Sequence, residues 1–214
     1  MAGWKEEPQY LIQRRASLAS LSYLGKVTRC STRGFVGAVR LPEAEFPTFG
    51  TFCQVEAQQG QSTVIGVVYN ISIDDDEFAR QMAAADNIPA EELLDNQQNR
   101  QVPVEFACLA VGYQRDGQYI YNLPPQPPLT LASIHTLDTE AMVAFTEQLD
   151  FIPLVLSAAS LPADLLLAEI LNNAAAARDE SHRSAYLVEA GRICARSLGG
   201  DLTRLNLIID RIRQ

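Results

Sequence analysis

The sequence predicts an α+β protein in which a small N-terminal β-barrel with a short helical insertion is followed by an all-α C-terminal domain. Between residues 23 and 137, short runs rich in Val, Thr, Tyr and Phe alternate with Gly, Pro and Asp, which is the pattern of strands joined by turns. Residues 74–95 interrupt this pattern with acidic and alanine-rich sequence. After Leu137, Ala and Leu become frequent and Gly is absent until Gly191, which is typical of helices.

The chain of 214 residues is expected to divide into three segments. Residues 1–22 form a lead-in, residues 23–137 the barrel-like domain and residues 138–214 the helical domain. Hydrophobic residues make up 47% of the chain, an ordinary value for a globular protein, so we expect a sizeable core. Several short strands in succession favour a small barrel or sandwich, a class of domain that usually binds a partner.

The first half of the barrel is expected to contain four strands. Gly34 and Gly37 flank Phe35-Val36, and glycine inside a strand pattern predicts a bulge or a bend that helps a short sheet to close. The turn at 58–61, Gln-Gln-Gly-Gln, joins the third and fourth strands as a hairpin. The four strands are expected at residues 23–28, 35–41, 51–57 and 62–69.

The insertion at 74–95 is expected to form one or two short helices. It opens with the acidic run Asp74-Asp75-Asp76-Glu77 and continues with alanine-rich sequence. Pro89 stands at a first helical position with Glu91 and Glu92 just inside it, which is a helix-start signal.

The second half of the barrel resumes with strands expected at 104–113 and 118–122. Asp116-Gly117 between them is the usual pair for a tight hairpin. Pro124–Pro128 then holds the chain extended and leads to a last apolar segment at 129–135. This block also resembles a proline-rich ligand for aromatic grooves, but a rigid connector between domains is the favoured interpretation.

The C-terminal segment is expected to contain five helices. Asp138 is a capping residue followed by an early acid, and Asp201 caps the last helix after the stop at Gly199-Gly200. Tyr186, Ala190, Ile193 and Cys194 share one helix face. The helices are expected at about 140–149, 153–160, 162–177, 180–197 and 201–212.

Composition disfavours several classes of function. The formal net charge of −9 repels phosphate backbones, so direct nucleic-acid binding is not expected. No uncharged apolar run approaches the ~20 residues that span a bilayer, and the N-terminus has no signal-like apolar region. We therefore expect a cytoplasmic protein. The one candidate basic patch combines Arg14, Arg15, Lys26, Arg29, Arg33 and Arg40, and scattered solvated charges are the favoured interpretation.

The four cysteines are expected to be reduced. Cys30, Cys53, Cys108 and Cys194 form no CxxC pair, and free cysteine is often a small buried hydrophobe. Reduced thiols fit a reducing compartment, and a disulfide between two barrel strands is the less favoured alternative.

Four blocks of sequence occur in a characteristic order: Leu24-Gly-Lys-Val, then Phe35 to Leu41, then Val64-Ile-Gly-Val-Val-Tyr, then Ala110-Val-Gly-Tyr with Asp116-Gly and the proline block. Together they resemble the HAS-barrel, the small β-barrel shared by HerA-type hexameric translocases and the N-terminal domains of F-type ATP synthase subunits. The resemblance covers about half of the chain. It implies a barrel that packs beside like barrels in a ring or docks a partner.

The chain departs from the translocases because no ATPase follows the barrel. The pattern G-x-x-x-x-G-K-[ST], which cradles phosphate, does not occur in the sequence. The residues after the barrel are too few for the RecA-like domain of those enzymes, so we do not expect ATP hydrolysis.

Candidate catalytic or metal-binding residues are few. Asp74–Glu77 offers oxygen ligands for Ca²⁺ or Mg²⁺, but the EF-hand spacing is absent and a solvated turn is favoured. His135 has Cys108 and Ser133 as hypothetical nucleophile partners, yet no G-x-S-x-G signature supports either pairing. His182 is expected at the surface, and neither histidine has a cysteine at zinc-ligand spacing.

We therefore expect no catalytic, cofactor-binding or metal residues and no cofactor. The leading hypothesis is a non-enzymatic interaction or assembly module whose partner is a second copy or a ring ATPase, with a homo-oligomer as one form. Two alternatives stay open: an adaptor in DNA processing that recruits a HerA-like translocase or nuclease, and a hydrolytic enzyme with an unrecognised site at His135.

Overall fold

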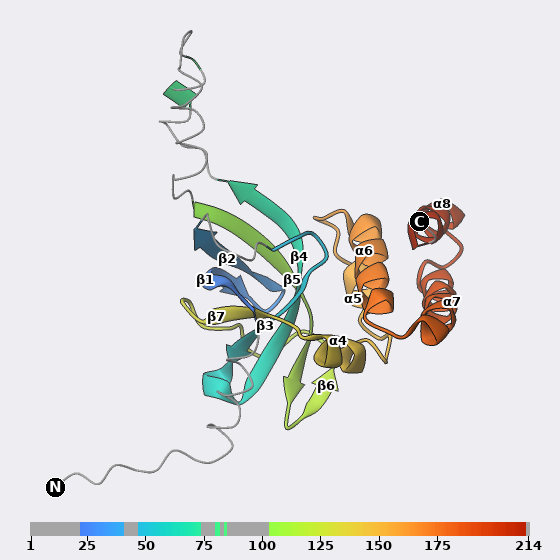
Figure 1. Ribbon diagram of the computed structural model, residues 1–214, viewed down its shortest axis with the longest axis horizontal. Helices are drawn as coiled ribbons and strands as arrows, with labels where there is room; N and C mark the ends of the chain where they lie inside the picture. The colour runs from blue at the N-terminus through green and yellow to red at the C-terminus, as the bar shows by residue number, and fades with distance from the viewer. Residues whose placement is uncertain (1–21, 41–46, 74–79, 82–83, 85–102, 213–214) are drawn as a thin grey trace, which may run out of the picture.

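The computed structural model describes residues 22–40, 47–73, 80–81, 84 and 103–212, and Figure 1 shows a β-barrel beside a group of helices. Six antiparallel strands close the barrel in the order β1-β2-β5-β4-β3-β7 and back to β1. β6 pairs with β5 outside this ring. The strands are β1 (Tyr23–Ser31), β2 (Gly34–Arg40), β3 (Phe52–Ala57), β4 (Ser62–Ile73), β5 (Pro103–Arg115), β6 (Gln118–Ile120) and β7 (Ser133–Thr136).

A β-barrel followed by helices, as predicted from the sequence, is confirmed. Three strands differ in their bounds from the expectation: β1 continues to Ser31, β4 continues to Ile73, and the last apolar segment is a strand only from Ser133 onward. The predicted insertion at 74–95 lies almost wholly outside the described residues. Within it, Arg80 and Gln81 have helical backbone, and the Ala84 N–H donates to the Arg80 carbonyl at 3.0 Å.

Side chains that alternate along the strands fill the inside of the barrel. Phe106 on β5, Ile134 on β7 and Val27 on β1 are completely buried there. Fully burying an aliphatic or aromatic side chain of this size contributes roughly 1.5–3 kcal/mol, so this cluster is the main stabilising element of the barrel. The other buried members of this inner cluster are Leu24, Phe35, Val39, Cys53, Val55, Ala57, Val64, Val68, Val104, Cys108 and Ala110.

Glycines allow the strands to approach closely where the barrel closes between β2 and β5. A Cβ at Gly34 would lie 2.1 Å from the Cys108 carbonyl oxygen, and one at Gly37 would lie 2.4 Å from Cζ of Phe106. The β2–β5 register runs without interruption. The irregularity predicted near these glycines lies on the facing strand β1, between Val27 and Arg29.

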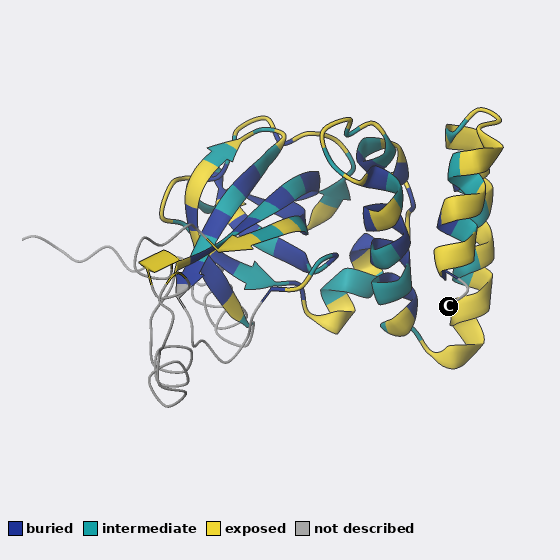
Figure 2. Ribbon diagram, turned by 90° about the horizontal axis from the view of Figure 1, so that it is seen from above, coloured by how far each residue is buried: buried dark blue, intermediate teal, exposed yellow. Residues whose placement is uncertain are grey.

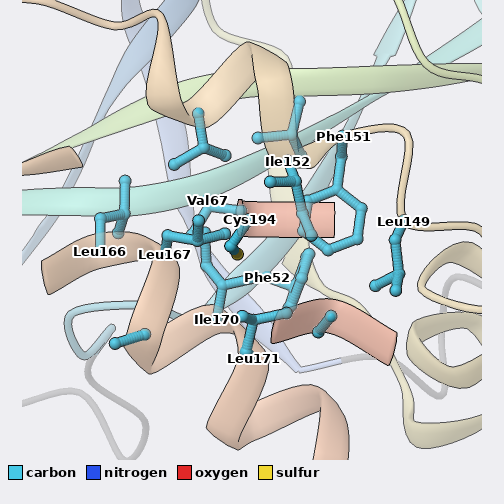
Figure 3. Packing of buried hydrophobic residues seen from close by; sticks show 14 of the residues in the cluster. Phe52, Val67, Leu149, Phe151, Ile152, Leu166, Leu167, Ile170, Leu171 and Cys194 are labelled. Carbon is cyan, nitrogen blue, oxygen red and sulfur yellow. The ribbon is translucent and has the colours of Figure 1, made fainter. Parts of the chain in front are cut away.

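A second hydrophobic core joins the outer face of the barrel to the helices. Phe52 on β3, Ile65 and Val67 on β4 and Val111 on β5 point away from the barrel interior and are buried. Figure 3 shows Phe52 and Val67 among side chains of the helices. The helical segment therefore packs on the barrel of its own chain. The helical side chains of this second core that Figure 3 labels are Leu149, Phe151, Ile152, Leu166, Leu167, Ile170, Leu171 and Cys194.

The ring of Phe145 is the centre of this outer core. Phe145 lies 5.3 Å from the ring of Tyr119, 5.2 Å from Tyr121, 6.1 Å from Phe52 and 5.9 Å from Phe151, measured between centroids. The Tyr121 hydroxyl also donates a hydrogen bond of 2.7 Å to the Phe145 carbonyl. These contacts hold the β5–β6 hairpin, which turns at Asp116-Gly117 as predicted, against the first helix.

The helices form two layers beside the barrel. In Figure 1, α4, α5 and α6 lie next to the strands and α7 and α8 lie on the far side of α5 and α6. In Figure 2 the outermost helices are mostly exposed, while the strands and inner helices are largely buried. The helices are α4 (Thr139–Phe145), α5 (Ile152–Leu156), α6 (Ala163–Ala176), α7 (Glu180–Ser197) and α8 (Leu202–Ile212).

The predicted caps at the helix starts are confirmed. The Asp138 carboxylate accepts from the Ala141 N–H at 2.7 Å, and the Asp201 carboxylate accepts from the Arg204 N–H at 3.2 Å. α4 ends at Phe145 rather than near 149, and α5 ends at Leu156 rather than near 160.

Arg178 ties α4, α6 and α7 together. Its guanidinium donates to the carbonyls of Ala174 at 2.6 Å and Val143 at 3.4 Å. The same group lies 3.8 Å above the ring centroid of Tyr186, a cation–π contact. One cation thus satisfies a carbonyl of α6 and one of α4 and contacts α7 through Tyr186.

Replacing Gly34 with Ala is expected to lower the free energy of unfolding by about 3 kcal/mol, because the added methyl group overlaps the β5 backbone. Urea denaturation followed by circular dichroism measures the change. Gly117→Asn is the control: a Cβ there has no atom within 4 Å, and Asn tolerates the φ of +76°. We expect the control to cost less than about 1 kcal/mol. Equal losses for the two variants would contradict this account of barrel closure.

The helical core is expected to lose stability at alkaline pH. Burial raises the pKa of Tyr186 to about 12, partly opposed by the Arg178 guanidinium, and burial raises the pKa of Cys194 to about 11. The folded state keeps these protons to higher pH than the unfolded state, so the stabilisation is complete below pH 9 and disappears as the pH rises through 11 and 12. A shift of two pKa units corresponds to roughly 2–3 kcal/mol.

Denaturation curves recorded between pH 8 and pH 11 test this expectation. Cys194→Ala removes the titrating thiol, so its stability, although lower throughout, is expected to fall less steeply with pH than that of the wild type. Stability that stays constant over this range in the wild type would count against a buried, protonated Cys194.

Candidate functional site

One end of the barrel carries two adjoining hollows lined mainly by glutamine. The 3-10 turn η1 (Gln58–Gly60) lies between them and contributes Gln58 and Gln59 to both. The larger hollow, about 800 Å³, extends to the β5–β6 turn. The smaller, about 340 Å³, extends to Gln126, Pro127 and Leu129. We call the residues around these hollows, 58–61, 114–117 and 126–131, the barrel-end surface.

Two leucines project from the barrel-end surface on a turn that we call the leucine turn, residues 129–132. Leu129 is 61% exposed and Leu131 is 69% exposed. The Leu131 N–H donates to the Val27 carbonyl at 2.8 Å, and the Val27 N–H donates to the Ala132 carbonyl at 3.0 Å. These bonds anchor the turn to β1, so both leucine side chains are held in solvent by a fixed backbone.

The leucine turn is also strained. Leu131 has φ +67°, a left-handed conformation that costs a residue with a Cβ about 1–2 kcal/mol. Such outliers persist where the surrounding structure fixes them, and they cluster at ligand-binding and switch regions. The Leu131 side chain is thus held in an exposed position on a strained backbone.

Glutamine side chains make up most of the lining of the two hollows. Their amides donate and accept hydrogen bonds without changing charge. Arg115 and Asp116 are the charged members, and the Arg115 guanidinium lies 5.5 Å from the ring centroid of Tyr113.

His135 is separated from one of its hypothetical nucleophiles. Cys108 faces the barrel interior, whereas His135 follows the inward-pointing Ile134 on β7 and therefore lies on the outer face. The His135 ring packs edge-on against Tyr23 at 5.9 Å. Ser133 shares the outer face, but no hydrogen bond between it and His135 is found among the described residues. His182 is exposed on α7, as predicted, with its Nδ1 3.2 Å from the Ser181 hydroxyl.

The four cysteines are free thiols, and three of them are buried. The Sγ atoms of Cys53 and Cys108 lie 3.5 Å apart inside the barrel. Burial and the neighbouring thiol of Cys53 raise the pKa of Cys108 well above its ordinary value. The Cys108 thiol therefore stays protonated, and both side chains belong to the inner core of the barrel. Cys30 is partly exposed.

The remaining sequence candidates form no site in the described part of the chain. Arg29 of the candidate basic patch pairs with Glu105 at 3.0 Å, and Arg14 and Arg15 lie outside the described residues. The acidic run 74–77 also lies outside them. Among the residues described, no cluster of three or more His, Cys, Asp or Glu side chains is arranged to hold a metal ion. No helix in the same part of the chain has the length and apolarity to cross a membrane.

The proline block is a connection within the barrel sheet. It joins β6 to β7, not two domains, and Pro128 pairs with Ala57 of β3 as an isolated bridge. Pro124 and Pro128 are buried, so half of its prolines are not available to an aromatic groove.

The chain matches no protein-family model, and comparison with curated proteins finds no match either. The closed six-stranded antiparallel barrel is thus established by the structure, whereas membership of the HAS-barrel family rests on the sequence blocks alone.

The leucine turn could not be identified from the sequence, because Leu129 to His135 has the composition of a strand. The available signal was the position of Leu129-Thr130-Leu131 directly after the proline block, because proline beside a strand pattern argues against a fully paired strand.

Replacing Leu131 with Asn is expected to raise the free energy of unfolding by about 0.5–1 kcal/mol, because Asn adopts positive φ more readily than Leu. Leu129→Asn is the matched control, because Leu129 is similarly exposed but does not have a positive φ. We expect the control to change stability by less than about 0.5 kcal/mol. Thermal and urea denaturation measure both. A loss of stability in Leu131→Asn would show that the side chain has a structural role.

Proposed function

We propose that this protein is a non-enzymatic interaction and assembly module that associates through the barrel-end surface, with a second copy or with a ring-shaped ATPase. The observation that carries the proposal is the leucine turn, in which an exposed and strained Leu131 is anchored by backbone hydrogen bonds to β1. Aliphatic side chains on a rigid turn make effective anchors, because little conformational entropy is lost when they bind.

The closed barrel limits how a partner can attach. All six strands of the ring have neighbours on both sides, so the ring offers no free edge for an added strand. Contacts must therefore come from side chains and loops. The barrel-end surface supplies an apolar anchor beside amide-lined hollows, the combination of apolar core and polar surround that protein interfaces use.

The resemblance to HAS-barrels supports the same function. In that family the barrel packs beside like barrels in a ring, and this chain has a closed barrel of six antiparallel strands. The sequence blocks that carry the resemblance fall mainly on β1, β2, β4 and β5, and the last block continues through the β5–β6 turn to the proline block. A HAS-barrel identity, with self-association or docking on a ring ATPase, is the finer form of the proposal.

Light scattering after size exclusion tests self-association. We expect the wild type to form an oligomer several times the monomer mass of 23.5 kDa at micromolar concentration. Replacing both Leu129 and Leu131 with Asp is expected to shift the population toward monomer and to weaken association at least about tenfold, since each exposed leucine loses an apolar contact.

Val188→Asp is the matched control for this experiment. Val188 on α7 is 53% exposed, close to the exposure of Leu129, and it lies away from the barrel-end surface. The control is expected to keep the wild-type mass. A wild type that stays monomeric up to high concentration, or a control that dissociates equally, would argue against self-association through the leucine turn.

A further inference from the structure

A second apolar surface lies on the helices. A groove of about 640 Å³ runs between the α5–α6 connection and α8. Leu156, Leu161 and Ala163 line it, while Leu165 and Leu207 remain 38% and 41% exposed. Partial exposure of leucines around a concave surface is typical of a binding groove.

Arginines border one side of the groove. Arg204, Leu207 and Arg211 are three and four residues apart on α8, so they form one stripe that faces the groove. Arg204 is held by Asp164, whose carboxylate accepts bonds of 2.6, 2.9 and 3.1 Å from its guanidinium. Arg211 makes no ion pair with any carboxylate of the described residues. Within the described residues, the groove thus offers leucines and a cation, Arg211, that has no ion-pair partner.

An occupant of matching chemistry needs leucines and a carboxylate a few residues apart. The chain itself contains this combination at Glu91-Glu92-Leu93-Leu94-Asp95, after Pro89. The connection from β4 to β5, residues 74–102, holds eight acidic residues and two arginines, which is most of the chain's net charge of −9. In the helix that the sequence predicts here, Leu94 and Asp95 share a face with Glu91.

We propose that the α5–α6–α8 groove binds residues 89–95 of a second copy of this chain. Leu93 and Leu94 would replace water against Leu165 and Leu207, and an acidic side chain of the segment would pair with Arg211. Charge complementarity between the acidic segment and Arg211 supports this pairing.

The contact joins two different surfaces of the molecule and is therefore heterologous. Heterologous contacts build closed rings when the rotation between neighbours closes, so this inference adds a second contact to the self-association proposed above. It does not depend on the leucine turn, and the two surfaces are tested by different variants.

A fluorescein-labelled peptide of residues 87–97 is the probe, titrated with the full-length protein and followed by fluorescence anisotropy. We expect saturable binding to the wild type and at least about tenfold weaker binding to Arg211→Glu, the loss expected when an interfacial charge is reversed. A peptide with Leu93→Asp and Leu94→Asp is expected not to bind. Arg33→Glu, the same charge change on an exposed residue of the β1–β2 turn, is expected to bind like the wild type.

The fold of Arg211→Glu is expected to be intact, because the contact of Arg211 with α6 uses its backbone carbonyl, which accepts from the Asn172 side chain at 3.2 Å. Its thermal unfolding is the check. Leu129→Asp with Leu131→Asp is expected to keep peptide binding, which separates failure of this proposal from failure of the first one.

Light scattering completes the test, since Arg211→Glu is expected to lower the assembled mass of the full-length protein. Absence of peptide binding by the wild type, or equal binding by Arg211→Glu, would overturn the proposal. Peptide binding by a wild type that remains monomeric at every concentration would also overturn it, since the segment would then not serve a second copy.

Discussion

The burial of both faces of β3, β4 and β5 is the constraint on which the rest of this structure depends. Their inner faces fill the barrel, and Phe52, Val67 and Val111 on the outer faces would be exposed without the helices. Phe145 meets this outer face and the β5–β6 hairpin at once, so the position of the first helix is set by aromatic packing. The helices and the outer face of the barrel therefore share one hydrophobic core, which is separate from the cluster inside the barrel.

Once both faces of these strands are covered, few apolar groups are left for a partner. Among the described residues, exposed leucines lie together at the leucine turn and at the α5–α6–α8 groove. The two surfaces differ physically: the turn is convex and backbone-anchored, whereas the groove is concave and bordered by an arginine. As we propose above, they serve two separate contacts, since the groove receives residues 89–95 of a second copy and the leucine turn belongs to the barrel-end surface.

Much of the fold could be predicted from local sequence. Asp116-Gly117 predicted the hairpin because both residues adopt positive φ, and Asp138 and Asp201 predicted helix starts because their carboxylates accept backbone N–H groups. The packing of the helices on the barrel was not predicted. The near-continuous apolar run Val64 to Tyr69 held the signal, since a strand that is buried on both faces loses its alternation. The leucine turn was missed for another reason, because composition does not reveal the sign of φ at Leu131.

The closure of the barrel has a consequence for how the chain is made. β1 pairs with β2 across a short turn, but the other edge of β1 pairs with β7, which is synthesised much later. The Thr136 N–H that donates to the Ser22 carbonyl follows Ser22 by 114 residues in the sequence. At about 5–20 residues per second, a ribosome needs roughly 5–20 s to synthesise the intervening chain. During that time β1 and β2 present unpaired backbone groups that the finished barrel hides. The nascent protein thus passes through an interval in which its N-terminal hairpin is open to incorrect strand pairing, and rapid completion of β5 and β7 protects it.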